Sequence, residues 1–286
     1  MKPTHRVNRY GKAELRLLKV DRDTDRHVLH DLTVSVALAG DMTEVHLSGD
    51  NANVLPTDTQ KNTVYAFARE QGVDQIEDFA GLLARHFVDT QASVHHARVH
   101  VEEHGWSRLD DADHSFAQSS REVRTATVTY DGQRDRVLTG LSGLVLLSST
   151  GSEFRGFATD AHTTLAETSD RILCTSLDAQ WRHEAADVNW ASSFDAARTA
   201  MTTAFADTYS RSLQQTLFAM GERVVSTVAG VLEVRLSLPN RHHFLVDLAP
   251  FGADNPGEVF QVADRPYGLI EGSVLADGVT ADTEAW

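Results

Sequence analysis

Four short segments of the chain combine residue types that bind small molecules or move protons. They are Tyr10–Glu14 (Tyr-Gly-Lys-Ala-Glu), Pro56–Thr63 (Pro-Thr-Asp-Thr-Gln-Lys-Asn-Thr), Phe154–Phe157 with the later Arg171, and Ser212–Gln214 with the later Pro239–His243. Histidine titrates near neutral pH, lysine acts as a base when its pKa is lowered, and arginine and glutamine present planar sets of hydrogen-bonding groups. Each segment is weak evidence when it is read alone.

Each of these segments also has an ordinary structural explanation. A lysine in a strand, such as Lys12, is most often a solvated charge at the edge of a sheet. A Thr/Asp cluster that enters a helix is usually a cap, and capping would account for Asp58 or Thr59. Spacing alone therefore does not separate a structural from a chemical interpretation.

The hydrophobic pattern predicts the elements that position these segments. Alternation predicts strands at Tyr10–Val20, His27–Leu38, Ser93–His104, Arg121–Tyr130, Thr139–Ser148, Thr168–Ala179, Leu232–Leu238 and His243–Leu248. Helical periodicity predicts helices at about Gln60–Glu70, Asp74–Asp89, Trp190–Met201 and Tyr209–Val228. The order strand, strand, helix, helix, strand, strand therefore occurs twice.

This order indicates an α+β fold, with antiparallel sheets and helices on one face. The turn at Asp131–Asp135 is the expected boundary between two domains, residues 1–135 and 136–286. A four-stranded sheet has exposed edges, so we expect oligomerisation to close the sheets into a barrel.

Composition excludes several classes of function. The chain of 286 residues has 26 Lys+Arg and 41 Asp+Glu, and a net charge of −15 argues against nucleic acid as a partner. No apolar run is long enough to span a membrane. A single cysteine, Cys174, excludes an internal disulfide and favours a reducing, cytoplasmic location.

Two conspicuous features are discounted as sites. His96, Arg98, His100, Glu102 and His104 share one face of a predicted strand, and the interspersed charges favour a hydrogen-bonded polar face over a metal site. Cys174 is expected to be a small buried hydrophobe. A glycine-rich phosphate-binding motif is missing, so a nucleotide cofactor is not expected.

Read together, the four segments resemble the urate oxidase (uricase) family. The matching motifs are Tyr-Gly-Lys at Tyr10–Lys12, Thr-Asp-x-x-Lys-Asn-Thr at Thr57–Thr63, the separation of Phe154 and Arg171, Ser-Leu-Gln at Ser212–Gln214, and Leu-Pro-Asn-Arg-His at Leu238–His242. Several motifs in the family's order, from about Val7 to about Ile270, make chance agreement improbable.

The resemblance implies two tandem tunnelling-fold domains and a homotetramer whose sheets close into barrels. It implies that urate, O2 and water give 5-hydroxyisourate and hydrogen peroxide, without metal or organic cofactor. It also implies active sites at subunit interfaces, to which Thr57 and Asp58 come from a neighbouring subunit.

The resemblance assigns a role to each matched residue. Arg171 and Gln214 would bind opposite edges of urate, Phe154 would stack on its face, and the Leu213 backbone would add a rim hydrogen bond. The expected proton relay is Lys12, Thr57 and His242. Asn240 would hold dioxygen or water above the ring, and Asp58 would chiefly position its loop.

Two alternatives stay open from the sequence. One is a zinc-dependent tunnelling-fold enzyme acting on a purine or pterin, for which the histidine-rich strand is the support. The other is a non-catalytic purine-binding assembly, against which the joint presence of Lys12, Thr57 and His242 argues.

Overall fold

The computed structural model describes residues 8–185 and 188–282, which form two compact units. Among the described residues, the first unit comprises 8–140, 182–185, 188–191 and 282, and the second comprises Leu141–Trp181 and Ser192–Ala281. The turn at residues 131–134 joins strands β4 and β5. Each unit is an antiparallel arrangement of strands with helices, so the expected α+β class is confirmed.

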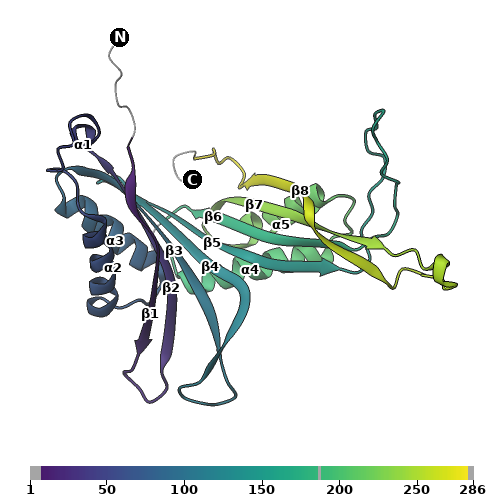
Figure 1. The fold of residues 1–286 in the computed structure, drawn as a ribbon, viewed down its shortest axis with the longest axis horizontal. Coiled ribbons are helices and arrows are strands. Elements are labelled where there is room, and N and C mark those ends of the chain that lie inside the picture. Colours follow the sequence, from purple (N-terminus) through teal and green to yellow (C-terminus); the bar gives the residue numbers. More distant parts are fainter. Residues whose placement is uncertain (1–7, 186–187, 283–286) are drawn as a thin grey trace, which may run out of the picture. The chain divides into compact units, whose positions relative to one another are not determined.

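The first unit pairs four strands in sequence order. They are β1 (Tyr10–Asp21), β2 (Val28–Gly40), β3 (Val94–Arg108) and β4 (Phe116–Tyr130), and each pairs antiparallel with the next. The helices of this unit are α1 (Thr43–Leu47), α2 (Thr57–Glu70) and α3 (Ile76–Thr90). Helices α2 and α3 lie on the same face of the strands (Figure 1).

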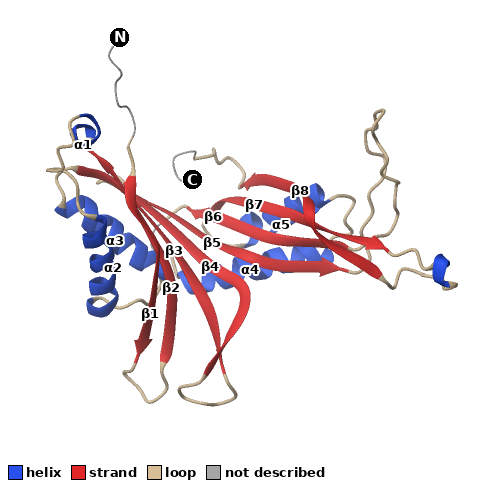
Figure 2. Cartoon of the chain, viewed as in Figure 1, coloured by secondary structure: helices blue, strands red, loops and turns tan. Residues whose placement is uncertain are grey.

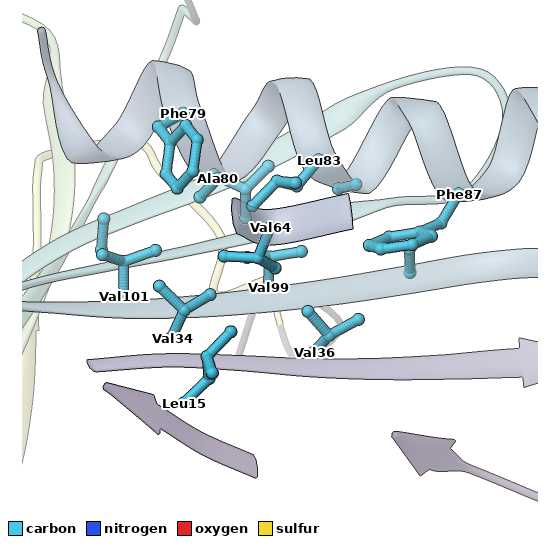
Figure 3. Close-up of a cluster of buried hydrophobic side chains, with 14 of the residues drawn as sticks. Leu15, Val34, Val36, Val64, Phe79, Ala80, Leu83, Phe87, Val99 and Val101 are labelled. Carbon is cyan, nitrogen blue, oxygen red and sulfur yellow. The ribbon is translucent and has the colours of Figure 1, made fainter. Parts of the chain in front are cut away.

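Alternation along the strands decides which side chains form the core of the first unit. In the middle of β2 and β3, at residues 32–38 and 97–101, every second residue is buried, and Figure 3 shows Val34, Val36, Val99 and Val101 on the side of the helices. The buried side chains that α3 and these strands contribute are Val34, Val36, Phe79, Leu83, Phe87, Val99 and Val101. Burying each one contributes about 1.5–3 kcal/mol of hydrophobic free energy. This packing fixes the register of β1–β4 and therefore the face on which each side chain lies.

The second unit repeats this arrangement with four further strands. Strands β5 (Asp135–Ser148), β6 (Leu173–His183), β7 (Val231–Leu245) and β8 (Phe260–Leu275) are hydrogen-bonded in sequence order. The start of β5 and the last two residues of β6 belong to the first unit. Helices α4 (Trp190–Asp207) and α5 (Leu213–Thr227) cover one face, and the short 3-10 helix η1 (Ala249–Phe251) lies between β7 and β8 (Figure 2).

Two glycines let α5 approach β8 closely. A Cβ on Gly221 of α5 would lie 2.5 Å from Val274 Cγ2, and one on Gly272 of β8 would lie 3.0 Å from Leu217 Cδ2. Both contacts are too close for a side chain without movement of the neighbour. The closeness of this packing therefore depends on glycine at both positions.

The prediction of two strands at Leu232–Leu238 and His243–Leu248 is wrong. The structure has one continuous strand, β7, which runs through Pro239. A proline in a strand cannot donate a backbone hydrogen bond, but its carbonyl can still accept one. The Pro239 carbonyl still accepts a hydrogen bond from Thr175 Oγ1 at 3.0 Å.

Strand β8 was not predicted, since the last strand expected from the sequence was His243–Leu248. In the register, Asn240 of β7 faces Gly268 and His242 faces Ala263, so the pairing is interrupted between them. Residues 264–267 form this irregular stretch. Pro266 therefore lies where the regular backbone pairing with β7 is interrupted, and its missing N–H breaks no regular ladder hydrogen bond. The strand continues on both sides of the interruption.

Other boundaries differ by a few residues. Helix α2 begins at Thr57 rather than Gln60, because its polar first turn has no apolar periodicity. Strand β6 begins at Leu173 rather than Thr168, which makes an isolated bridge with Phe154 instead. Helix α1 was not predicted, since five residues are too few to show a helical period. No helix in the described part of the chain is both long and apolar enough to cross a membrane.

Gly11 gives a direct test of the β1–β2 pairing. A Cβ at this position would lie 1.8 Å from the Val36 carbonyl oxygen, so Gly11→Ala must push the strands apart next to Lys12. We expect the free energy of unfolding to fall by at least about 2 kcal/mol, measured by urea denaturation.

The matched control is Gly105→Ala in β3, where the added Cβ would make an ordinary 3.5 Å contact with Ser119. Its stability should stay the same or rise by up to about 1 kcal/mol. Equal stability of the two variants would contradict the close approach at Gly11.

Candidate active site

A cavity of about 550 Å³ lies in the second unit and gathers four of the predicted site residues. Phe154, Arg171, Asn240 and His242 all line it. Its volume is typical of small-molecule binding sites. The cavity therefore brings together residues that are up to 88 positions apart, from Phe154 to His242, in the chain.

Phe154 and Arg171 are fixed by backbone hydrogen bonds on either side of the loop that joins them. The Phe154 N–H donates to the Thr168 carbonyl at 2.9 Å, and the Arg171 N–H donates to the Ser152 carbonyl at 2.9 Å. The Arg171 Cζ lies over the Phe154 ring, 5.2 Å from its centroid. Burial lowers the pKa of the Arg171 guanidinium, whose ordinary value is high enough that the group stays charged. An aromatic face and a cation thus meet at one wall of the cavity.

Asn240 and His242 lie at the interruption of the β7–β8 pairing. In a regular strand, successive side chains point to opposite faces of the sheet, and an irregularity in the pairing changes these directions. Here the consecutive residues 240–243 all line the cavity. The His242 ring stacks on Phe244 with centroids 5.7 Å apart and an interplanar angle of 24°. The irregular pairing therefore supplies an amide and an imidazole to the same space.

Leu213 and Gln214 are the first two residues of α5 and do not line this cavity. Ser212 caps the helix by accepting a hydrogen bond from the Gln215 N–H at 3.2 Å. The Leu213 side chain is 2% exposed and belongs to the core of the unit. Its N–H, at the first helical position, has no acceptor within the helix. Gln214 is exposed.

Lys12, Thr57 and Asp58 lie in the first unit. Lys12 is in β1, where the pairing with β2 is interrupted, and Thr57 begins α2, which packs on β1. Hydrogen bonding to Lys61 and its charge lower the pKa of Asp58, and the charge of Lys12 adds to this effect. Lys12 and Asp58 are therefore close enough to interact electrostatically.

Capping does not explain the Thr/Asp cluster. The residue before α2 is Pro56, and the helix has no side-chain cap. The ordinary structural explanation, a cap by Asp58 or Thr59, is therefore contradicted, and Asp58 instead pairs with Lys61. Within the described residues, the Thr57 hydroxyl makes no hydrogen bond, which leaves it available to a ligand.

The histidine-rich strand is a hydrogen-bonded polar face, as expected. His100 Nδ1 lies 2.8 Å from Thr127 Oγ1, and His104 Nε2 lies 2.8 Å from Thr33 Oγ1. In residues 8–185 and 188–282, no group of three or more side chains is placed to hold a metal ion. The observation that favoured a zinc enzyme therefore has a structural explanation.

Other residues lie at or beside the cavity: Phe157 does not line it, whereas further apolar side chains do. Phe157 stacks on Phe154 with centroids 5.0 Å apart and an interplanar angle of 14°. Apolar walls come from Leu165, Leu245 and Phe260. Phe157 belongs to the Phe154–Phe157 motif and is noticeable in the sequence. Leu165, Leu245 and Phe260 belong to no motif, and only the fold shows that they lie next to the predicted site residues.

Comparison with known proteins decides the family. A family model described as uricase matches residues 8–129 and 137–271. The chain belongs to the uricase family. A curated uricase from Arthrobacter globiformis is 48% identical over 279 residues, which cover 98% of this chain and 92% of its own. A uricase from Dictyostelium discoideum is 38% identical, covering 93% of this chain and 96% of its own.

Solved structures extend the likeness to the uricase fold. The crystal structure of uricase from Arthrobacter globiformis matches with a TM-score of 0.97 at 47% identity, covering 100% of this chain and 99% of that chain. A uricase from Bacillus fastidious matches with a TM-score of 0.80 at 23% identity, covering 95% and 94%, which shows a common fold.

The one cysteine of this uricase family member is buried in strand β6. Cys174 is 4% exposed, and burial raises the pKa of its thiol. We expect a thiol reagent such as dithiobisnitrobenzoate to leave the native protein unlabelled and to label one thiol per chain in denaturant. Rapid labelling of the native protein would contradict the burial of Cys174.

Proposed function

We propose that the chain is a urate oxidase that converts urate, O2 and water into 5-hydroxyisourate and hydrogen peroxide. The observation that carries the proposal is the convergence of Phe154, Arg171, Asn240 and His242 on one cavity in a chain of the uricase family. The reaction balances without a further oxidant, because O2 accepts two electrons and two protons to become peroxide. We propose that no metal or organic cofactor takes part.

Urate is a flat anion at neutral pH, and the cavity offers matching groups. Phe154 would stack on the purine face, a contact worth about 1–3 kcal/mol in comparable base–aromatic pairs. The Arg171 guanidinium would bind one edge of the anion with two parallel hydrogen bonds. The start of α5 would bind another edge through the Leu213 N–H and the Gln214 amide, which has both a donor and an acceptor.

The proton relay would run through Lys12, Thr57 and His242. Lys12 would act as the base that takes a proton from urate. The Thr57 hydroxyl can pass a proton on, because it is both donor and acceptor. His242 would complete the relay, and Asn240 would hold first O2 and then the attacking water above the ring.

The division of these residues between units supports a site built from two subunits. Lys12, Thr57 and Asp58 belong to the first unit, whereas Phe154 and Arg171 belong to the second. We propose that the first unit of one subunit completes the cavity in the second unit of its neighbour. Asp58 would position the α2 start, where Lys61 already holds it.

We propose a homotetramer in which residues 1–135 and 136–286 are tandem tunnelling-fold domains. Among the described strands, β1 and β8 each have a strand partner on one side only, and such edges favour pairing with another copy. Barrel closure by the assembled subunits would satisfy both edges. The single buried Cys174 supports a reducing compartment, and we propose the cytoplasm.

The decisive assay follows the ultraviolet absorbance of urate with chelator-treated protein, with peroxide measured in parallel and an anaerobic control. The proposal predicts O2-dependent loss of urate with matching peroxide. Metal-dependent turnover would point to a metalloenzyme instead. Tight urate binding without turnover by the intact oligomer would point to a non-catalytic purine-binding protein.

Lys12→Met tests the proposed base. The variant keeps the aliphatic length of the side chain but has no basic nitrogen, so urate affinity should stay close to that of the wild type. Turnover should fall by about 100-fold or more, measured as kcat at saturating urate.

The matched control is Lys19→Met, which removes the same charge from the same strand, where Lys19 pairs with Asp21. Its turnover should be unchanged. If Lys12→Met also keeps full turnover, Lys12 has no part in the proton relay.

A further inference from the structure

Ser152 is hydrogen-bonded to Arg171 and is fully buried, with 0% of its surface exposed. Its Oγ accepts a hydrogen bond from Arg171 Nε at 3.2 Å, and its carbonyl accepts one from the Arg171 N–H at 2.9 Å. One residue therefore holds both the main chain and the side chain of the arginine that lines the cavity. Ser152 itself does not line the cavity.

This contact matters because arginine is long and flexible. A free arginine loses side-chain conformational entropy when a ligand fixes it. A hydrogen bond at Nε fixes the rotation of the guanidinium plane and leaves the two terminal nitrogens for a ligand. Those nitrogens form no hydrogen bond with any other described residue, and the Cζ lies over the Phe154 ring.

The same segment also ties Arg171 to the start of α5. Ser152 and Ser210 form a parallel bridge, in which the Ser210 N–H donates to the Gly151 carbonyl at 2.9 Å and the Glu153 N–H donates to the Ser210 carbonyl at 2.8 Å. Ser210 Oγ donates to the Ser212 carbonyl at 3.1 Å, next to the helix start.

Buried hydroxyls reinforce this connection. Thr216 Oγ1 donates to Ser210 Oγ at 2.8 Å, and both residues are buried. Buried polar groups that are fully hydrogen-bonded hold one arrangement rigidly. Ser152 is therefore hydrogen-bonded to Arg171 and paired with Ser210, which lies just before helix α5 and its residue Gln214.

We propose that Ser152 is a positioning residue for ligand recognition: its hydroxyl orients the Arg171 guanidinium toward a planar anion, and its backbone sets the spacing between Arg171 and the start of α5. This inference rests on the proposed binding of urate in the cavity. Ser152 touches neither the substrate nor O2 and acts through Arg171.

The test is Ser152→Ala, which removes one buried oxygen and leaves every backbone hydrogen bond in place. Urate binding is measured anaerobically, so that affinity is separated from turnover. The Kd for urate should rise about tenfold, because a hydrogen bond to a charged group is lost, while kcat stays within about twofold. Ser152→Cys, which keeps the volume but has a weak acceptor, should weaken binding in the same direction if the alanine variant does not fold.

A double-mutant cycle shows whether Ser152 acts through Arg171. In Arg171→Lys, a methylene replaces the Nε–H, so Ser152→Ala should cause no further loss of affinity in that background. The control Thr127→Val removes a buried hydroxyl from the other unit, where it bonds His100, and should leave the urate Kd unchanged.

Three results would overturn the inference. Wild-type affinity in a folded Ser152→Ala protein would show that the hydroxyl does not orient Arg171. An equal loss of affinity in the Arg171→Lys background would show that Ser152 acts by another route. Failure of the wild-type protein to bind urate would appear before any variant is made, and it would overturn the proposed function together with this inference.

Discussion

The structure depends on one constraint, which is that helices cover only one face of each set of four strands. Side chains on the covered face must be apolar and those on the other face polar, and strand geometry turns this requirement into strict alternation. In β2, Val34 and Val36 are buried under the helices, whereas Thr33 and Ser35 point the other way. The same constraint places His100 and His104 on a polar face, where neighbouring threonines bind them.

The predicted site residues lie where this regularity is interrupted. Lys12 is at a break in the β1–β2 register, and Asn240 and His242 flank a break in the β7–β8 register. Helix starts supply Thr57 and Leu213, whose first N–H groups have no helical acceptor. The regular elements therefore provide stability, and their interruptions expose the groups that can bind a ligand or exchange protons.

Alternation in the sequence was sufficient to predict most elements but not their ends. Strand β1 and helix α3 follow clear periods and are found within two residues of the predicted bounds. The segment that begins at Pro239 was predicted to separate two strands, but β7 continues through it, and the Pro239 carbonyl is still hydrogen-bonded. Strand β8 was not predicted, and only the register shows how it pairs with β7.

The site was predictable through motifs rather than through spacing. Phe154, Arg171, Asn240 and His242 were named from the family resemblance, and the fold brings them into one cavity. Ser152 could not be predicted, because a serine in a loop has no distinguishing pattern. Its importance arises from a hydrogen bond to a side chain 19 positions away.

The central claim is that a complete site combines the first unit of one subunit with the second unit of another. The most direct measurement co-expresses Lys12→Met and Arg171→Ala chains carrying different affinity tags and assays the purified mixed oligomers. Each parent should be inactive, whereas the mixed oligomers should recover urate oxidation well above either parent, because some sites then contain both intact halves. Mixed oligomers as inactive as the parents would show that each site lies within one chain and would contradict the account.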